Sequence, residues 1–173
     1  PAISELAEGL DVDVVPASVD DGRQFDVLIN GKDRTWEIRS NEVNGSVSEV
    51  SVYPGVRVAM TELQRKIASK GRIVVLGRDI GTVVLPDADL KIYLDASIEV
   101  RAQRRLLEEL SRGNTLDLEK TIEMLRHRDV IDSTREHAPL KAAEDAILIN
   151  TDHLTIEQVV DKIIGIVSDC SQA

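Results

Sequence analysis

Aromatic residues and cysteine are scarce in this chain. Aromatics make up 2% of its 173 residues, so the hydrophobic core must be built mainly from Val, Ile, Leu and Ala. The one cysteine, Cys170, cannot form an internal disulfide and has no partners for a zinc site. A reducing, cytoplasmic setting is therefore expected. No apolar run is long enough to cross a membrane, so no membrane association is expected.

Positive charge is also in short supply. Lys and Arg number 21 against 31 Asp and Glu, which gives a formal net charge of −10. Such a chain repels the phosphates of DNA and RNA, so no nucleic-acid partner is expected. A small phosphorylated ligand remains compatible with this charge, because a local arginine cluster can outweigh the global field. The three histidines show no metal-ligand spacing, and no resident metal site is predicted.

Turn signals separate short apolar segments in the first third of the chain. Val12–Val15, Phe25–Ile29 and Thr35–Ile38 are predicted strands, and Asn30-Gly31 between the last two favours a hairpin. The whole stretch from Val12 to Ser51 is expected to be extended. We interpret it as a small antiparallel sheet inserted into a larger fold.

Continuous apolar segments then alternate with helical patterns. A helix is predicted from Pro54 to about Lys70, and the strands Ile73–Leu76, Leu90–Leu94 and Ala146–Ile149 show no polar alternation. Strands of this kind indicate a parallel sheet covered by helices on both faces, an α/β fold.

Three further helices are expected in the second half. Ser97 is a plausible N-cap for a helix reaching Arg112, with Gly113 as its end, and a second helix runs from about Asp117 to Arg135. Thr155 and Gln158 match a capping box before a last amphipathic helix.

Arg128, Asp132 and Arg135 are the first candidate site residues. Their i, i+4, i+7 spacing places them on one face of a predicted helix. Arginines can hold a phosphate and a carboxylate can accept from a ribose hydroxyl. A solvated helix face with ion pairs explains the same spacing.

Two other clusters could likewise be either ligand-binding or purely structural. Arg104 and Arg105 could reach a phosphate, or could pair with Glu108 and Glu109 on an ordinary helix surface. Arg78-Asp79 follows a predicted buried strand, and ligands of open parallel sheets bind beyond the carboxyl ends of strands. A tight turn with a structural aspartate is the alternative.

Three longer stretches, taken together, resemble one family. They are GRDIGTVVLPDADLKIYLDAS (77–97), RHRDVIDSTREHAPLKAAEDAILINT (126–151) and IRSNEVNGSVSEVSVYPGVR (38–57). In this order and separation they are similar to segments of bacterial cytidylate kinases. The resemblance covers nearly the whole chain and implies a kinase-like α/β domain, with a monophosphate-binding insertion at 10–50, a core at 54–106 and 136–170, and a lid near 107–122.

The resemblance also implies a reaction and site roles. The reaction is transfer of the ATP γ-phosphoryl group to CMP or dCMP with Mg²⁺, by an enzyme that is a monomer at full length. The resemblance implies three sets of substrate-binding residues, which contact the cytosine, the acceptor phosphate and the sugar. It also implies a catalytic set, which acts on the transferred phosphoryl group. The cytosine set is Ser48, Arg57 and Asp79, the phosphate set Arg78 and Arg135, the sugar set Arg128 and Asp132, and the catalytic set Arg104, Arg105 and Arg135.

The phosphate-gripping loop G-x-x-x-x-G-K-[ST] of such kinases does not occur among these residues. The chain also begins at Pro1 rather than Met. The favoured expectation is an N-terminally truncated kinase that lacks its first strand, P-loop and following helix, and is inactive by itself. The alternatives are a nucleotide-binding module that has lost catalysis and a purely structural partner domain.

Overall fold

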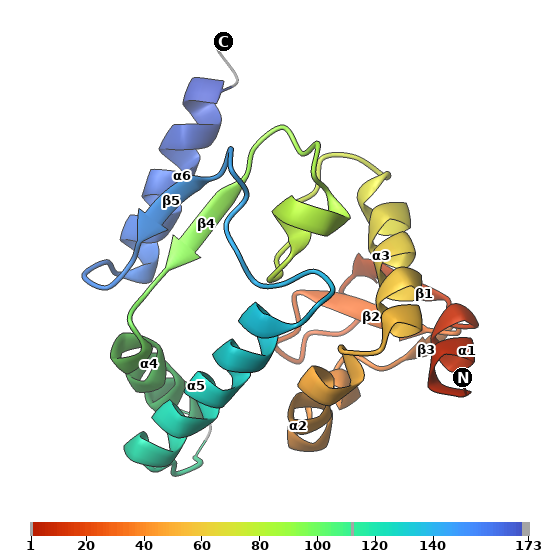
Figure 1. The fold of residues 1–173 in the computed structure, drawn as a ribbon, viewed down its shortest axis with the longest axis horizontal. Coiled ribbons are helices and arrows are strands. Elements are labelled where there is room, and N and C mark those ends of the chain that lie inside the picture. The colour runs from red at the N-terminus through yellow and green to blue at the C-terminus, as the bar shows by residue number, and fades with distance from the viewer. Residues whose placement is uncertain (1, 112, 171–173) are drawn as a thin grey trace. The chain divides into compact units, whose positions relative to one another are not determined.

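A computed structural model describes residues 2–111 and 113–170 (Figure 1). None of the helices in these two stretches is long and apolar enough to span a membrane. The elements are α1 (Ala2–Glu8), β1 (Val12–Pro16), β2 (Phe25–Ile29), β3 (Lys32–Asp33), η1 (Glu37–Arg39), α2 (Asn41–Val50), α3 (Pro54–Ala68), η2 (Ile80–Val84), β4 (Ile92–Asp95), α4 (Ile98–Ser111), α5 (Leu118–Thr134), β5 (Ile147–Asn150) and α6 (Ile156–Cys170).

The chain forms two compact units. The first consists of the residues up to Val84 together with Arg135–Ala138, and the second of Leu85–Thr134 and the residues from Pro139 onward. The first unit contains an antiparallel sheet and the second a parallel strand pair. The α/β class and both kinds of strand pairing agree with the sequence-based expectation.

The sheet of the first unit has three strands, and its short third strand forms the predicted hairpin with the strand before it. Strand β1 pairs antiparallel with β2, and β2 pairs with β3 through the turn at Asn30 and Gly31. Both turn residues have positive φ, at 50° and 72°, as a type I′ hairpin turn requires. The hairpin prediction is therefore confirmed.

The expected strand at Thr35–Ile38 is wrong. Strand β3 ends at Asp33, and the chain then turns into the 3₁₀ helix η1. The Asp33 carboxylate accepts from the Thr35 backbone N–H at 2.9 Å, and the Thr35 hydroxyl accepts from the backbone N–H of Val27 at 2.8 Å. A side chain thus takes the place of a ladder carbonyl, which ends the strand.

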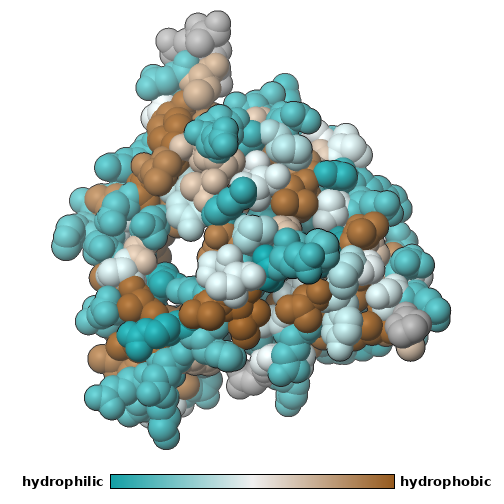
Figure 2. All heavy atoms as spheres, viewed as in Figure 1, coloured by the Kyte–Doolittle hydropathy of each residue, from teal (hydrophilic) through white to brown (hydrophobic). Residues whose placement is uncertain are grey.

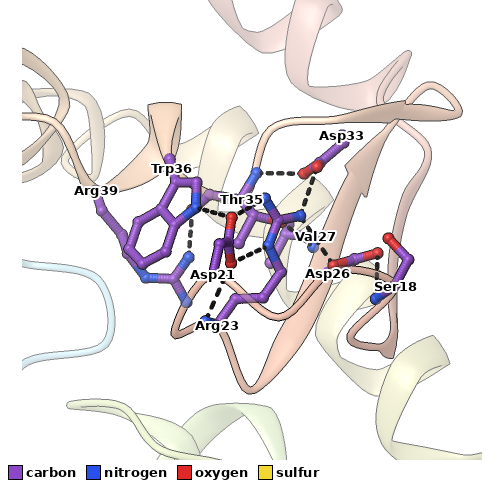
Figure 3. Close-up of polar contacts among 9 residues, drawn as sticks. All are labelled: Ser18, Asp21, Arg23, Asp26, Val27, Asp33, Thr35, Trp36 and Arg39. Carbon is purple, nitrogen blue, oxygen red and sulfur yellow. Dashed lines mark hydrogen bonds and ion pairs between the residues drawn. The ribbon is translucent and has the colours of Figure 1, made fainter.

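The Arg23 side chain connects Asp21, Asp26 and Asp33 (Figure 3). It is 6% exposed and forms ion pairs with Asp21, Asp26 and Asp33 at 2.7, 3.0 and 2.6 Å. Asp21 also accepts from the Trp36 indole N–H at 2.8 Å. Hydrogen bonds from Thr35 and from Arg23 lower the pKa of Asp33 to about 2. We call Asp21, Arg23, Asp26 and Asp33 the arginine cluster of the sheet.

The expectation of extended structure up to Ser51 is also wrong, because residues 41–50 form the helix α2. The Ser40 hydroxyl accepts from the backbone N–H of Val43 at 3.3 Å and caps the first turn. The sequence NEVNGSVSEV has no strict alternation of apolar and polar residues, and Val43, Val47 and Val50 recur at the i, i+4, i+7 spacing of a helix.

Helix α3 is the centre of packing in the first unit. Pro54 starts it and Gly71, with φ 79°, follows its end, both as predicted. The small core at Ala7, Val56 and Ala59 joins α1 to α3. A Cβ on Gly55 would lie 2.6 Å from the Cβ of Ser4, so glycine allows the close approach of the two helices.

The predicted strand Ile73–Leu76 is absent from the described structure, and its side chains are not buried. Val74 is 88% exposed and Leu76 is 86% exposed. None of the strands in residues 2–111 and 113–170 pairs with this segment, and an extended segment without a partner gains no strand hydrogen bonds. The structure therefore corrects both the element and its burial.

The second unit pairs β4 with β5 in parallel, from Ile92 opposite Ile147 to Asp95 opposite Asn150. These strands fall one to two residues after the predicted positions. The Ser97 cap of α4 is confirmed by a hydrogen bond from the Val100 N–H to the Ser97 hydroxyl at 3.4 Å. Gly113 adopts a φ of 81° beyond the helix, while Arg112, the expected last residue, lies outside the described residues.

The capping box of α6 is confirmed, but its apolar face is not buried. The Thr155 N–H donates to Gln158 at 2.9 Å, and the Gln158 N–H donates to Thr155 at 3.3 Å. Figure 2 shows apolar side chains exposed along this helix. Ile156 and Ile164 are two of its exposed apolar residues. On β5, Leu148 is likewise 66% exposed, so the sheet is not covered as fully as the sequence predicts.

Candidate functional site

An ion pair between Arg57 and Asp79 is the first element of the candidate site. Arg57 lies in the first turns of α3, and Asp79 immediately precedes η2, 22 residues later in the sequence. The two side chains are only 14% and 15% exposed. Such shielding from water strengthens the interaction of each group with a charged partner.

Arg135 lies beside this pair in the same unit. Its Nε donates to the Ala138 carbonyl at 2.6 Å, which orients the guanidinium. Burial lowers the pKa of Arg135, the Arg57 cation lowers it further, and the Asp79 carboxylate opposes both effects. We call Arg57, Asp79 and Arg135 the acceptor cluster.

The acceptor cluster gathers charged side chains in a chain of net charge −10. It contains two guanidinium groups and one carboxylate from three segments of the chain. A guanidinium fits phosphate oxygens well. The cluster can therefore bind a phosphorylated ligand while its carboxylate accepts a hydrogen bond.

A turn of π-helix, η2, holds the Asp79 end of the cluster. The Asp79 carbonyl accepts from the backbone N–H groups of Val83 and Val84 at 2.9 and 3.2 Å. Val84 is 1% exposed, so one end of the turn is fixed in the core. The side chain of Arg65, which sequence reasoning did not single out, donates to the carbonyls of Val83 and Val84.

The predicted glycine-containing loop at 77–82 has a packing role as well. A Cβ on Gly77 would lie 2.8 Å from the Ile80 side chain, so glycine lets the backbone pass close to η2. Arg78 follows, half-buried, in the same unit as the acceptor cluster. Its assignment to the acceptor phosphate stays a prediction.

Ser48 lies on α2, half-buried, also in the first unit. Its carbonyl accepts from the Ser51 hydroxyl at 2.8 Å, and α2 packs against η1. Within residues 2–111 and 113–170, no hydrogen bond joins the Ser48 hydroxyl to the acceptor cluster. The role of Ser48 in reading the base is a prediction.

Arg128 and Asp132 share one face of α5, as their spacing predicts. The Arg128 Nε lies 3.9 Å from an Asp132 carboxylate oxygen, and Asp132 is 3% exposed. The helix ends at Thr134, so Arg135 lies just beyond it rather than on it, and Arg135 belongs to the first unit. The shared helix face thus holds for two of the three predicted residues.

Arg104 and Arg105 have protein partners within the second unit. Arg104 donates to the Thr151 hydroxyl at 3.0 Å and to the Thr151 carbonyl at 2.5 Å. Arg105 pairs with Glu108 at 3.1 Å and with Glu109 at 3.2 Å. The Arg105 contacts match the helix-surface alternative, whereas Arg104, within the described residues, bonds to Thr151 and not to the expected Glu108. A catalytic role for either arginine remains a prediction.

No group of three or more His, Cys, Asp or Glu side chains that could hold a metal ion occurs among residues 2–111 and 113–170. Asp26 and Asp79 each pair with an arginine.

An α/β chain with this acceptor cluster is of the kind that binds small phosphorylated molecules. Comparison with known proteins supports a narrower class: the cytidylate kinase profile matches residues 2–169. The chain belongs to the cytidylate kinase family, a family of phosphotransferases.

Individual relatives agree with this assignment. The chain is similar to cytidylate kinase of Herpetosiphon aurantiacus, with 42% identity over 99% of this chain and 73% of the relative. It is 46% identical to cytidylate kinase of Carboxydothermus hydrogenoformans over 95% of this chain and 72% of the relative. With the Geobacillus sp. cytidylate kinase it shares 52% identity over 83% of this chain and 64% of the relative.

Proposed function

We propose that this chain binds CMP or dCMP as the acceptor in transfer of the γ-phosphoryl group of ATP. ATP enters as its Mg²⁺ complex, so the metal is part of the substrate. The observation that carries the proposal is the acceptor cluster, because it joins two arginines and one carboxylate in a chain of the cytidylate kinase family.

The carboxylate in the cluster suits cytosine. The exocyclic amino group of cytosine is a donor, and its ring nitrogen and carbonyl oxygen are acceptors. Asp79 can accept from the amino group, while Arg57 and Ser48 can donate to the ring acceptors. Uracil has a carbonyl in place of the amino group, so an ionised Asp79 disfavours UMP.

The remaining acceptor groups are assigned to the phosphate and the sugar. Arg78 and Arg135 bind the monophosphate, and Arg135 also acts as a catalytic residue beside the transferred group. Arg128 and Asp132 bind the ribose hydroxyls. Phosphoryl transfer needs mainly positioning and charge neutralisation, and arginines supply both.

The donor side of the reaction is assigned only to Arg104 and Arg105. For either to reach ATP, its present contact with Thr151, Glu108 or Glu109 must be exchanged for phosphate oxygens. The sequence from Pro1 to Ala173 contains no G-x-x-x-x-G-K-[ST] loop. Nucleotide binding without catalysis is therefore the second candidate function.

Calorimetry and a coupled ADP-release assay on the gene product that contains these residues test the proposal. We expect binding of CMP, weaker binding of UMP and cytidine, and ATP-dependent turnover of CMP. Binding of CMP with no turnover at saturating MgATP would favour the non-catalytic candidate. No preference for CMP over UMP and cytidine would refute the acceptor assignment.

A further inference from the structure

Arg65 makes two hydrogen bonds that no part of the proposed substrate binding requires. Its Nε donates to the Val84 carbonyl and its Nη2 donates to the Val83 carbonyl, each at 2.8 Å. Arg65 is an exposed residue near the C-terminal end of α3, two turns beyond Arg57. One side chain therefore binds two successive backbone carbonyls of η2.

These carbonyls need a donor from outside the turn. The last carbonyls of any helix have no intrahelical N–H partner. The helix cannot continue here, because the ring of Pro86 clashes with the preceding turn and disfavours helical backbone at Leu85. The planar guanidinium fork supplies two parallel donors at once, which a single lysine ammonium does not reproduce.

The same two residues hold Asp79 through their amides. The backbone N–H groups of Val83 and Val84 both donate to the Asp79 carbonyl. The Asp79 carboxylate in turn pairs with Arg57, so α3 holds the turn at both ends. A displacement of Val83 and Val84 would move Asp79 relative to Arg57.

We propose that Arg65 is a positioning residue for base recognition: it fixes η2 on α3 so that the Asp79 carboxylate faces the cytosine amino group. This inference rests on the proposed function. It predicts that Arg65 contributes to the preference for CMP over UMP without touching either nucleotide.

The experiment compares Arg65→Gln, Arg65→Lys and Lys66→Gln in the same gene product. Lys66→Gln is the matched control, because it removes a cation from the same turn whose ammonium forms an exposed ion pair with Asp11 at 3.4 Å. Calorimetry gives Kd for CMP and UMP, melting gives Tm, and hydrogen exchange reports on the amides of Val83 and Val84.

Arg65→Gln is expected to weaken CMP binding about tenfold, the effect of one strong hydrogen bond, while UMP binding changes little. Amide exchange of Val83 and Val84 should accelerate. Arg65→Lys should restore part of the preference, and Lys66→Gln should retain all of it. A general loss of stability would weaken CMP and UMP binding by the same factor.

Two results would overturn the inference separately from the proposed function. An unchanged ratio of CMP to UMP affinity in Arg65→Gln, with normal CMP binding by the parent protein, would refute the role of Arg65 alone. Absence of CMP preference in the parent protein would refute the proposed function, and the positioning role would fall with it.

Discussion

Replacing Asp79 with asparagine tests the proposed base recognition directly. The change keeps the size of the side chain but removes its charge and turns one acceptor oxygen into an amide donor. The Asp79 carboxylate is the anionic partner of Arg57 and lies beside Arg135. We therefore expect Asp79→Asn to weaken CMP binding and to improve UMP binding relative to CMP.

The magnitude follows from the shielding of the pair. Asp79 and Arg57 are 15% and 14% exposed, so water replaces a lost hydrogen bond poorly. A hydrogen bond to a charged group contributes about 1.5–3 kcal/mol, which corresponds to roughly 10- to 150-fold in CMP affinity. The asparagine amide can donate to the uracil carbonyl, so the CMP-to-UMP affinity ratio should fall at least about tenfold.

Calorimetric titration of CMP and UMP is the assay, with Tm measured for each variant. Asp11→Asn is the matched control, because the Asp11 carboxylate forms an exposed ion pair with Lys66. An unchanged affinity ratio in Asp79→Asn would refute base reading by Asp79. An equal loss for both nucleotides would show that Asp79 acts only by holding Arg57.

Two further predictions concern stability. In acid, circular dichroism should show the sheet losing stability as the pH falls from about 4, the unfolded aspartate pKa, to about 2, the folded pKa of Asp33, since a lowered pKa stabilises the fold only while the carboxylate is ionised. Arg23→Gln should lower Tm and weaken that transition, and equal behaviour of the exposed control Arg34→Gln would contradict the role of the arginine cluster. Val74→Ala should change the free energy of unfolding by less than about 0.5 kcal/mol, because Val74 is 88% exposed. The same change at Val84, which is 1% exposed, should cost about 2 kcal/mol, and similar costs at both positions would show that Val74 is buried.

Two local motifs could be predicted from the sequence, because the residues that form each motif lie close together in the chain. The turn at Asn30 and Gly31 needs only two residues that tolerate positive φ. The capping box of Thr155 and Gln158 needs only two side chains three residues apart. In each case the residues that make the interaction are neighbours, so their spacing carries the information.

Two elements in which a small polar side chain bonds to the backbone were not predicted from the sequence. Thr35 bonds to Val27 across the sheet and ends a strand that an apolar pattern predicts to continue. Ser40 caps a helix in a stretch expected to be extended. The Thr35 side chain competes with a ladder hydrogen bond through local geometry that periodicity does not encode. The helix capped by Ser40 could have been found, since Val43, Val47 and Val50 have helical spacing.

The candidate site also contains residues that were identified from the sequence and one that was not. Resemblance identified Arg57, Asp79 and Arg135 as candidates, and the structure brings these three together. Arg65 was missed because it binds backbone carbonyls, and any residue can supply a carbonyl. A side chain that recognises backbone leaves no paired signal in the sequence, so geometry is needed to find it.

The segment Ile73–Leu76 shows what an apolar run does and does not encode. It is as continuously apolar as residues 146–149, and both segments were predicted to be buried parallel strands. In the second case the chain supplies a neighbour, since Tyr93 pairs with Leu148 in β4 and β5. In the first, no ladder partner is found among the described strands, and Val74 and Leu76 are exposed. An apolar run thus records a preference for burial, whereas a strand also requires a partner backbone with free N–H and C=O groups. That partner is a property of the assembled sheet, so composition alone cannot distinguish the two segments.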